Sequence, residues 1–312
     1  MHEEPLPRHV SLGSRHDEPS SERLCERIHQ ARAHGIRTVH PRSGQLTRSS
    51  PAVRRHLDET AVTIDTVTAD SADVAAPEAF FSTVWLASVN DAGRNEALAH
   101  ARRAAADALA AGARVLLLAP GPILVDDGPS RHAGLVDDLK RGRSIDADHV
   151  ASLIANRAEI EEHGLDRTCR TLYELCREFP DLQFCLMPGS TFYDIPQRHH
   201  VELLLSDVGA PNLGYWHDPG RCAALEAQGF DRHESWLEAY KEQMVGITLH
   251  DADGVDSGLV PGAGSLDLAM LGDYAAAGTR VTIDARPDWG DEGIRQAVAI
   301  LQKYGFLTAR VR

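Results

Sequence analysis

Three side chains of types that transfer protons follow apolar runs in the last third of the chain. Asp218 lies in YWHDPGR, His250 in ITLHDAD and Asp284 in VTIDARP. Two carboxylates and an imidazole suit general acid–base work on a polyol, or the binding of one divalent ion such as Mg²⁺, Mn²⁺ or Zn²⁺. An alternative is that Asp218 caps a turn or helix start and that His250 is a buried histidine with satisfied hydrogen bonds.

Four further side chains near these three could hold an anionic sugar or sugar acid. Arg221 and Arg286 carry guanidinium groups, which bind carboxylates and phosphates through paired hydrogen bonds. Trp216 and Trp289 offer flat faces for the apolar side of a sugar ring. For each tryptophan the alternative is packing in the core or in a lid, and for Arg286 it is a salt bridge to Asp218 or Asp284.

The elements that must position these residues alternate along the chain. Short runs rich in Val, Ile and Leu predict strands at 8–14, 36–41, 61–68, 114–120, 182–188, 213–219, 244–251 and 280–287. Amphipathic or alanine-rich stretches between them predict helices, among them 96–113, 150–179 and 291–305. Strands alternating with helices over this length predict a parallel sheet covered by helices, closed as a (β/α)8 TIM barrel.

The competing architecture is an open, doubly wound sheet. Neither GxGxxG nor GxxxxGK[ST] occurs, so the phosphate loop that would favour it is missing from the sequence. We therefore expect residues 1–312 to form a single barrel domain. The polar stretch 121–148 predicts an insertion after the fourth strand, either as a lid over the barrel mouth or as a surface excursion.

Composition excludes several classes of protein. The net charge is -14 and no Lys/Arg-rich block occurs, so we expect no nucleic-acid partner. No apolar run approaches the roughly 20 residues of a membrane span, and the first residues do not have the layout of a signal peptide. The 5 cysteines form no CxxC pair, which favours reduced thiols and a cytoplasmic location.

Three stretches together resemble the xylose isomerase-like barrels, the sugar isomerases and epimerases related to apurinic endonuclease. They are GYWHDPGR, GITLHDADGVDSGLVPGAGSLDLAML and VTIDARP. In that family the sixth strand ends in Asp-x-x-His, the seventh carries His-x-x-Asp, and a glycine-rich segment follows. PGAGSLDLAMLGDY looks like the small-residue turn and helix after that segment. The first half of the chain resembles the family only in its strand–helix rhythm.

The chain departs from the family's ligand set at several positions. Asp218 matches the sixth-strand aspartate, but the position of its histidine partner is taken by Arg221. The seventh-strand histidine falls on Thr248, with His250 two residues further on. The fifth-strand glutamate falls on Met187, and the endonuclease Asp-x-His falls on 256–258, which ends in glycine.

These departures imply a degenerate metal site. The eighth-strand glutamate falls on Asp284, which is one methylene shorter. Met187 can neither abstract a proton nor ligate a hard cation, and the fixed charge of Arg221 repels one. What remains is at most one divalent ion held by Asp218, His250 and Asp284.

The leading hypothesis is an enzyme related to sugar isomerases and epimerases. It would act on a small carbohydrate, polyol or sugar acid with an altered or absent metal site. The alternative is a non-catalytic barrel that binds a metabolite or a protein partner. Because the family's barrels often pair, the resemblance also implies a homodimer.

The chain should not cleave abasic DNA, because it lacks both the endonuclease ligand set and a basic surface. We expect no incision above background when Zn²⁺ or Mn²⁺ is supplied to the purified protein with an abasic duplex. Robust incision that is abolished by Asp218→Ala would overturn this interpretation.

Overall fold

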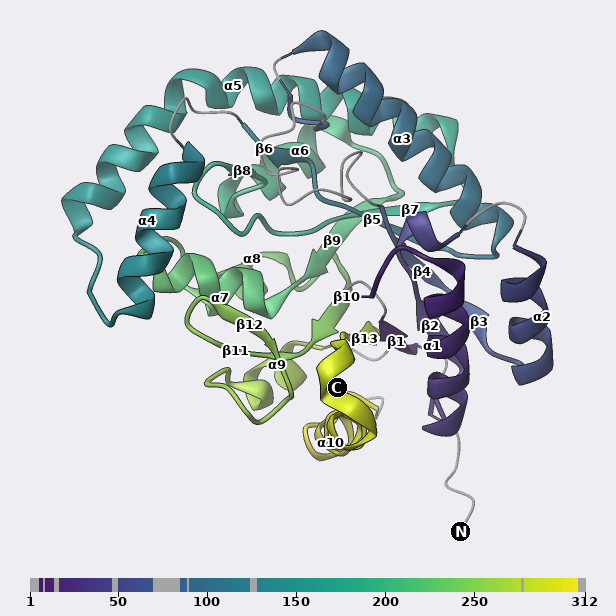
Figure 1. Cartoon of the computed structure of the whole chain (residues 1–312). Helices are drawn as coiled ribbons and strands as arrows, with labels where there is room; N and C mark the ends of the chain where they lie inside the picture. Colours follow the sequence, from purple (N-terminus) through teal and green to yellow (C-terminus); the bar gives the residue numbers. More distant parts are fainter. Residues whose placement is uncertain are drawn as a thin grey trace.

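Parallel strands form the centre of the molecule, and helices surround them (Figure 1). The computed structural model describes residues 6–7, 9–13, 17–46, 50–69, 85–88, 90–123, 128–275 and 278–307. The central sheet has the order β3-β2-β1-β13-β10-β9-β7-β5-β4. Its strands are β1 (Val10–Gly13), β2 (Thr38–His40), β3 (Thr63–Ile64), β4 (Thr66–Thr68), β5 (Val115–Leu118), β7 (Gln183–Leu186), β9 (Leu213–His217), β10 (Met244–Leu249) and β13 (Arg280–Ile283).

The sheet is a nearly closed barrel whose two ends meet in a single stretch of chain. β3 pairs with β2, and β4 pairs with β5, yet only Asp65 separates β3 from β4. The Asp65 carbonyl accepts the backbone N–H groups of both Arg114 and Val115, at 2.8 and 3.1 Å, which interrupts the regular ladder at this residue. The eight predicted strands are therefore present, the third of them in two pieces, and the predicted barrel is confirmed over the open sheet.

Helices cover the outside of the barrel (Figure 1). They are α1 (Ser21–Ala33), α2 (Pro51–Thr60), α3 (Asp91–Ala110), α4 (Gly128–Lys140), α5 (Ala147–Glu178), α6 (Arg198–Val208), α7 (Pro219–Ala227), α8 (His233–Tyr240), α9 (Leu268–Tyr274) and α10 (Gly290–Lys303), with the 3-10 turns η1 (Ser43–Gln45) and η3 (Pro287–Trp289). None of the described helices is long and apolar enough to cross a bilayer.

Side chains just before several helices determine where those helices begin. Ser20, Ser50, Asn90, Asp146 and Asp218 each accept a backbone N–H from the first turn of the helix that follows. Such caps satisfy amides that the helix itself leaves without partners. The cap at Asp218 matters for function, because it fixes one of the predicted site residues to the first turn of α7.

The segment 121–148, predicted as an insertion, contains ordered elements. β6 (Gly121–Pro122) pairs in an antiparallel manner with β8 (Asp194–Ile195), and α4 follows. Lys140 at the end of α4 forms an ion pair with Asp256 at 3.2 Å. This contact joins the inserted segment to the hairpin of β11 (Asp251–Asp253) and β12 (Asp256–Leu259), which the sequence did not predict. A lid function for the segment stays a prediction.

The barrel interior is apolar on one side and polar on the other. The apolar side is formed by buried side chains of β5, β7 and β9, namely Val115, Leu117, Cys185 and Trp216, together with Met187 just after β7. Trp216 is fully buried, and its Nε1 donates to Thr248 Oγ1 at 2.9 Å. A Cβ on Gly246 would lie only 2.2 Å from the Trp216 ring, so this glycine provides the space that the indole fills.

Gly246→Ala should destabilise the fold, because the added methyl group must displace a ring that is packed on all sides. Overpacking of this kind costs about 1–3 kcal/mol. Gly134→Ala is the matched control, since a Cβ there meets nothing within 4 Å and the residue lies inside α4. Urea unfolding should show the loss only for Gly246→Ala, and equal free energies of unfolding would contradict the packing described.

Candidate active site at the barrel mouth

The carboxyl ends of the parallel strands bring the predicted residues to one end of the barrel. Side chains alternate along a strand, so Asp218 shares the inward face of Trp216, and His250 shares that of Thr248. Leu249 pairs with Ile283 across the ladder, and the Asp284 backbone N–H donates to the Leu249 carbonyl at 3.0 Å. The following residues, His250 and Asp284, are therefore neighbours in register.

Asp218 and His250 are in direct contact. His250 Nε2 lies 3.2 Å from Asp218 Oδ1, and both side chains are about 1% exposed. Asp218 Oδ1 also accepts the Arg221 backbone N–H at 3.2 Å, while Asp218 Oδ2 lies 3.6 Å from Arg221 Nε. Asp218 thus caps α7, as the structural alternative expected, and it also faces an imidazole; proton transfer by these residues stays a prediction.

The hydrogen-bond partners of His250 show which of its ring nitrogens carries the proton. The Gly258 backbone N–H donates to His250 Nδ1 at 2.9 Å. The Asp251 carbonyl also lies 3.2 Å from Nδ1, but an N–H can only donate, and the Gly258 contact is the shorter. Nδ1 is therefore the acceptor and Nε2 carries the proton, which it donates to Asp218.

Asp284 lies in a small cavity on the same inward face. The cavity has a volume of about 10 Å³, room for roughly one water molecule. Its described lining is Gly13, His40, Thr68, Leu117, Thr248, Thr282 and Asp284. Asp218 and His250 are not among the lining residues of this cavity, although they share the inward face of the mouth with Asp284.

His40 is a candidate site residue that sequence reasoning missed. It is buried, with Nδ1 2.8 Å from Thr282 Oγ1 and Nε2 2.9 Å from Thr68 Oγ1. Thr282 Oγ1 in turn lies 2.9 Å from Ser11 Oγ. His40 is the last residue of β2, so it could have been found by inspecting the carboxyl ends of the first three predicted strands as well as those of the last five.

Arg221 lies at the barrel mouth, and its guanidinium already has partners in the protein. Its Nη1 donates to the Pro188 carbonyl at 2.9 Å, just beyond β7, and its side chain is 28% exposed. It therefore connects the end of one strand to the Asp218 carboxylate that follows β9. Its partial exposure leaves part of the guanidinium accessible to a ligand.

The other three predicted substrate-binding residues have packing contacts. Trp216 fills the barrel interior. Trp289 is 8% exposed, and its Nε1 donates to the Gly258 carbonyl at 3.0 Å. Arg286 lies 3.4 Å from Asp288 and its stem passes beneath Gly258, where an added Cβ would meet Arg286 Cδ at 2.8 Å. Trp289 and Arg286 thus contact the hairpin of β11 and β12.

The donor atoms at the mouth do not fit a divalent ion. Both ring nitrogens of His250 have hydrogen-bond partners, and the Arg221 guanidinium faces Asp218. Thr248 Oγ1 accepts from Trp216, and Met187 is buried in the apolar cluster. A metal would have to displace Gly258 or Arg221 to reach two of the three predicted ligands.

A second cluster with metal-ligand residue types lies between α5 and α6. His199 and His200 place their Nε2 atoms 3.0 and 2.5 Å from Glu161 Oε1, and all three offer ligand atoms within 4.8 Å of one another. Arg157 Nε donates to Glu161 Oε2 at 2.6 Å, and the Gln197 N–H donates to His200 Nδ1. The guanidinium repels a cation, and the Gln197 bond leaves the proton on His200 Nε2, so this cluster does not fit a metal either.

The hydrogen bonds within that cluster explain its electrostatics. Those from His199 and His200 hold the pKa of the Glu161 carboxyl well below its usual range, with Arg157 contributing. Burial lowers the pKa of His200 despite this neighbour. Because Arg157 Nη1 also donates to the Phe192 carbonyl at 2.8 Å, the cluster attaches α5 to the loop that follows β7.

Behind Asp218 lies a buried histidine pair. His217 Nε2 is 2.9 Å from His233 Nε2, and the Tyr215 hydroxyl is 2.9 Å from His217 Nδ1. Burial lowers the pKa of His217 well below its ordinary value, and His233 lowers it further. Burial lowers the pKa of His233 to about 4. The pair is therefore neutral in the folded protein at physiological pH.

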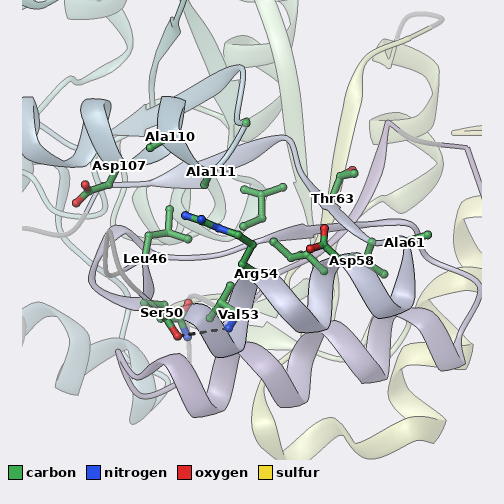
Figure 2. A pocket seen from close by; sticks show the side chains of 15 residues that line it. Leu46, Ser50, Val53, Arg54, Asp58, Ala61, Thr63, Asp107, Ala110 and Ala111 are labelled. Carbon is green, nitrogen blue, oxygen red and sulfur yellow. Dashed lines mark hydrogen bonds between the residues drawn. The ribbon is translucent and has the colours of Figure 1, made fainter.

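Two larger grooves lie outside the mouth. One, of about 570 Å³, runs between α2 and α3, and Figure 2 shows the Arg54 side chain extending into it. The groove is lined by one basic residue, Arg54, and two acidic ones, Asp58 and Asp107, so its charge favours neither an anionic nor a cationic ligand. The other, of about 550 Å³, lies over the cluster of Glu161 and His199. Neither contains a predicted site residue.

Comparison with known proteins places this geometry in a known fold. No protein-family model matches the chain, and no curated protein matches it in sequence. Solved structures do match. The 3-keto-D-glucoside 4-epimerase from E. coli superposes with a TM-score of 0.65 at 14% identity, over 95% of this chain and 100% of that one. The chain has the xylose isomerase-like barrel fold.

Two further structures extend the comparison. D-psicose 3-epimerase from Clostridium cellulolyticum H10 has a TM-score of 0.65 at 12% identity, with 96% and 99% of the two chains covered. A xylose isomerase domain protein from Planctomyces limnophilus has a TM-score of 0.58 at 16% identity, with 98% and 100% covered. The resemblance seen in the sequence is thus confirmed at the level of the fold.

The buried histidine pair should make stability fall with acid. Because the folded-state pKa of His233 is about 4, the unfolded chain binds more protons as pH falls from about 6.5 to about 4, and stability is lost across that window. His233→Asn should reduce the loss between pH 7.5 and pH 5 by about 2 kcal/mol in urea unfolding. His149→Asn, at an exposed position, is the control and should leave the pH dependence unchanged. An unchanged slope in His233→Asn would contradict the neutral pair.

Proposed function

We propose that this chain is an enzyme related to sugar isomerases and epimerases that acts on a small carbohydrate, polyol or sugar acid. The observation that carries the proposal is the buried contact between Asp218 and His250 with Arg221 beside it, at the mouth of a barrel shared with sugar epimerases. The proposal includes a cytoplasmic location, no nucleic-acid partner and a homodimeric assembly.

The proposed chemistry is proton transfer next to a carbonyl group. A carboxylate removes the proton from carbon, the C–H electron pair forms a C=C bond while the carbonyl π pair moves onto oxygen, and a proton then returns to the carbon from one face or the other as the carbonyl re-forms. Asp218, His250 and Asp284 are the groups to which we assign proton transfer. Arg221 would stabilise the charge that develops on oxygen, a role that a fixed cation can fill without a metal ion.

Substrate contact is assigned to Arg221 among the four residues predicted for it. An anionic group on the substrate would complete the hydrogen bonds of the guanidinium of Arg221, whose side chain is 28% exposed. Trp216, Arg286 and Trp289 would act indirectly, through the packing of the barrel and of the hairpin.

The alternative, a non-catalytic barrel that binds a metabolite or protein partner, has one observation in its favour. Asp218 and His250 are about 1% exposed, and the described cavity beside Asp284 has room for roughly one water molecule. A catalytic barrel must open at the mouth to admit a sugar, whereas a non-catalytic one need not.

Exchange of carbon-bound hydrogen in D₂O separates the two functions even when the product is unidentified. Ketoses such as D-fructose and D-tagatose, together with sugar acids and phosphates, would be incubated with the protein and followed by NMR for loss of the proton beside the carbonyl. Asp218→Asn should slow exchange by about 10²–10⁴-fold. Asp181→Asn, an exposed change just before β7 at the opposite end of the barrel, is the control. No exchange across the panel would favour the non-catalytic barrel.

Arg221 should govern the binding of anionic ligands. Arg221→Ala should weaken binding by about ten- to a hundred-fold, since a charge-assisted paired contact contributes about 1.5–3 kcal/mol. Arg221→Lys should recover only part of the lost affinity, because an ammonium group keeps the positive charge but cannot form the paired hydrogen bonds of a guanidinium. A thermal-shift titration of sugar acids and sugar phosphates measures the effect, with the exposed Arg295→Ala as control. A ligand that binds all variants equally well would contradict this role.

A further inference from the structure

The hairpin of β11 and β12 holds the imidazole that faces Asp218. Its only described backbone donor to His250 is Gly258, whose N–H points at Nδ1 from 2.9 Å. A proton on Nδ1 would face this N–H directly, so the contact excludes the Nδ1–H tautomer. The Asp251 carbonyl near Nδ1 could accept a proton there only after Gly258 had moved.

Gly258 itself is fixed by three features. Its φ of +79° is a conformation that favours glycine. Its carbonyl accepts from Trp289 Nε1 at 3.0 Å, a buried hydrogen bond. The Arg286 stem lies beneath it, so that even a Cβ would collide with Cδ at 2.8 Å. The Trp289 hydrogen bond orients the peptide group that follows Gly258. The preceding peptide group, which carries the Gly258 N–H, is contacted at the Ser257 carbonyl by Arg286 Nη1 at 3.5 Å.

The opposite side of the imidazole is equally constrained. A Cβ on Gly220, in the first turn of α7, would lie 2.3 Å from His250 Cε1 and 2.8 Å from Ser257 Cβ. The ring therefore lies between the first turn of α7 and the hairpin, close to the Gly220 backbone. Asp251, which follows His250 directly, fixes the base of the hairpin to the segment after it, because its carboxylate accepts the backbone N–H groups of Ala252, Gly262 and Leu266 at 2.8–3.1 Å.

We infer that Trp289 is a positioning residue, which acts through Gly258 to lock His250 as the Nε2–H tautomer directed at Asp218. Asp218 favours the same tautomer, because its oxygen accepts from Nε2, and the Gly258 N–H excludes a proton from the other ring nitrogen. In the proposed proton transfer, the lock keeps the His250 proton on the nitrogen that faces the carboxylate. The catalytic role of this tautomer rests on the proposed function, whereas the tautomer itself is a structural property that can be measured without activity.

The tautomer can be measured directly by two-bond ¹H–¹⁵N correlation NMR of the histidine rings, with the His250 signals assigned by their loss in His250→Gln. The wild-type protein should show a protonated Nε2 and an unprotonated Nδ1. Trp289→Phe removes the indole N–H together with part of the ring, and it should raise the Nδ1–H population to a detectable share. Trp236→Phe is the matched control, since the Nε1 of this buried tryptophan has no hydrogen-bond partner among the described residues.

A second variant tests whether the hairpin or Asp218 determines the tautomer of His250. Asp218→Asn retains a good helix cap, and His250 should keep its Nε2–H tautomer because Gly258 still donates to Nδ1. A tautomer that changes in Asp218→Asn but not in Trp289→Phe would overturn the inference. The result does not depend on activity: a locked tautomer without deuterium exchange would leave the inference standing and count against the proposed function.

Discussion

The Asp218 carboxylate is buried, and the arrangement of the barrel mouth follows from the need to satisfy it. An ionised carboxyl group removed from water is costly unless hydrogen bonds and opposite charge compensate. Here the compensation comes from three groups: the Arg221 N–H in the first turn of α7, the Arg221 guanidinium, and the imidazole of His250 just after β10. Each of these groups is in turn held elsewhere, Arg221 by Pro188 beyond β7 and His250 by the hairpin.

This arrangement uses protein groups where a metal-dependent barrel would use an ion. Arg221 supplies a permanent positive charge at the carboxylate, and neither ring nitrogen of His250 is left for a cation. The interior below is filled by Trp216, which takes up the space left by Gly246 and is tied to Thr248. The mouth is consequently tight, and ligand entry in the proposed reaction requires movement of the groups that cover it.

Much of the fold could be predicted from the sequence. Each of the eight apolar runs contains an observed strand, and the long helices α3, α5 and α10 lie where periodicity and capping signals placed them. The alternation of side chains along a strand also put Asp218, His250 and Asp284 on the inward face, because this alternation depends only on local backbone geometry. The break at Asp65 was not predictable, since it arises from hydrogen bonds with Arg114 on another strand.

The roles of individual side chains at the mouth were harder to predict, because they depend on partners distant in sequence. A single sequence does not distinguish a tryptophan that packs in the core from one that binds a ligand. Trp216 packs in the barrel interior because Gly246, on the neighbouring strand, leaves space for its ring. His40 ends a predicted strand, but its partner Thr282 is 242 positions away. The hairpin residues Asp256–Leu259 lack the apolar alternation that marks a strand, so the donor to His250 could not be foreseen.

Anomalous diffraction from crystals of the wild-type protein soaked with Mn²⁺ tests most directly whether protein groups alone satisfy the buried carboxylate. We expect no anomalous peak within bonding distance of Asp218, together with the Gly258 N–H still in contact with His250 Nδ1. A manganese ion coordinated by Asp218, His250 and Asp284, with Arg221 turned away, would contradict that claim.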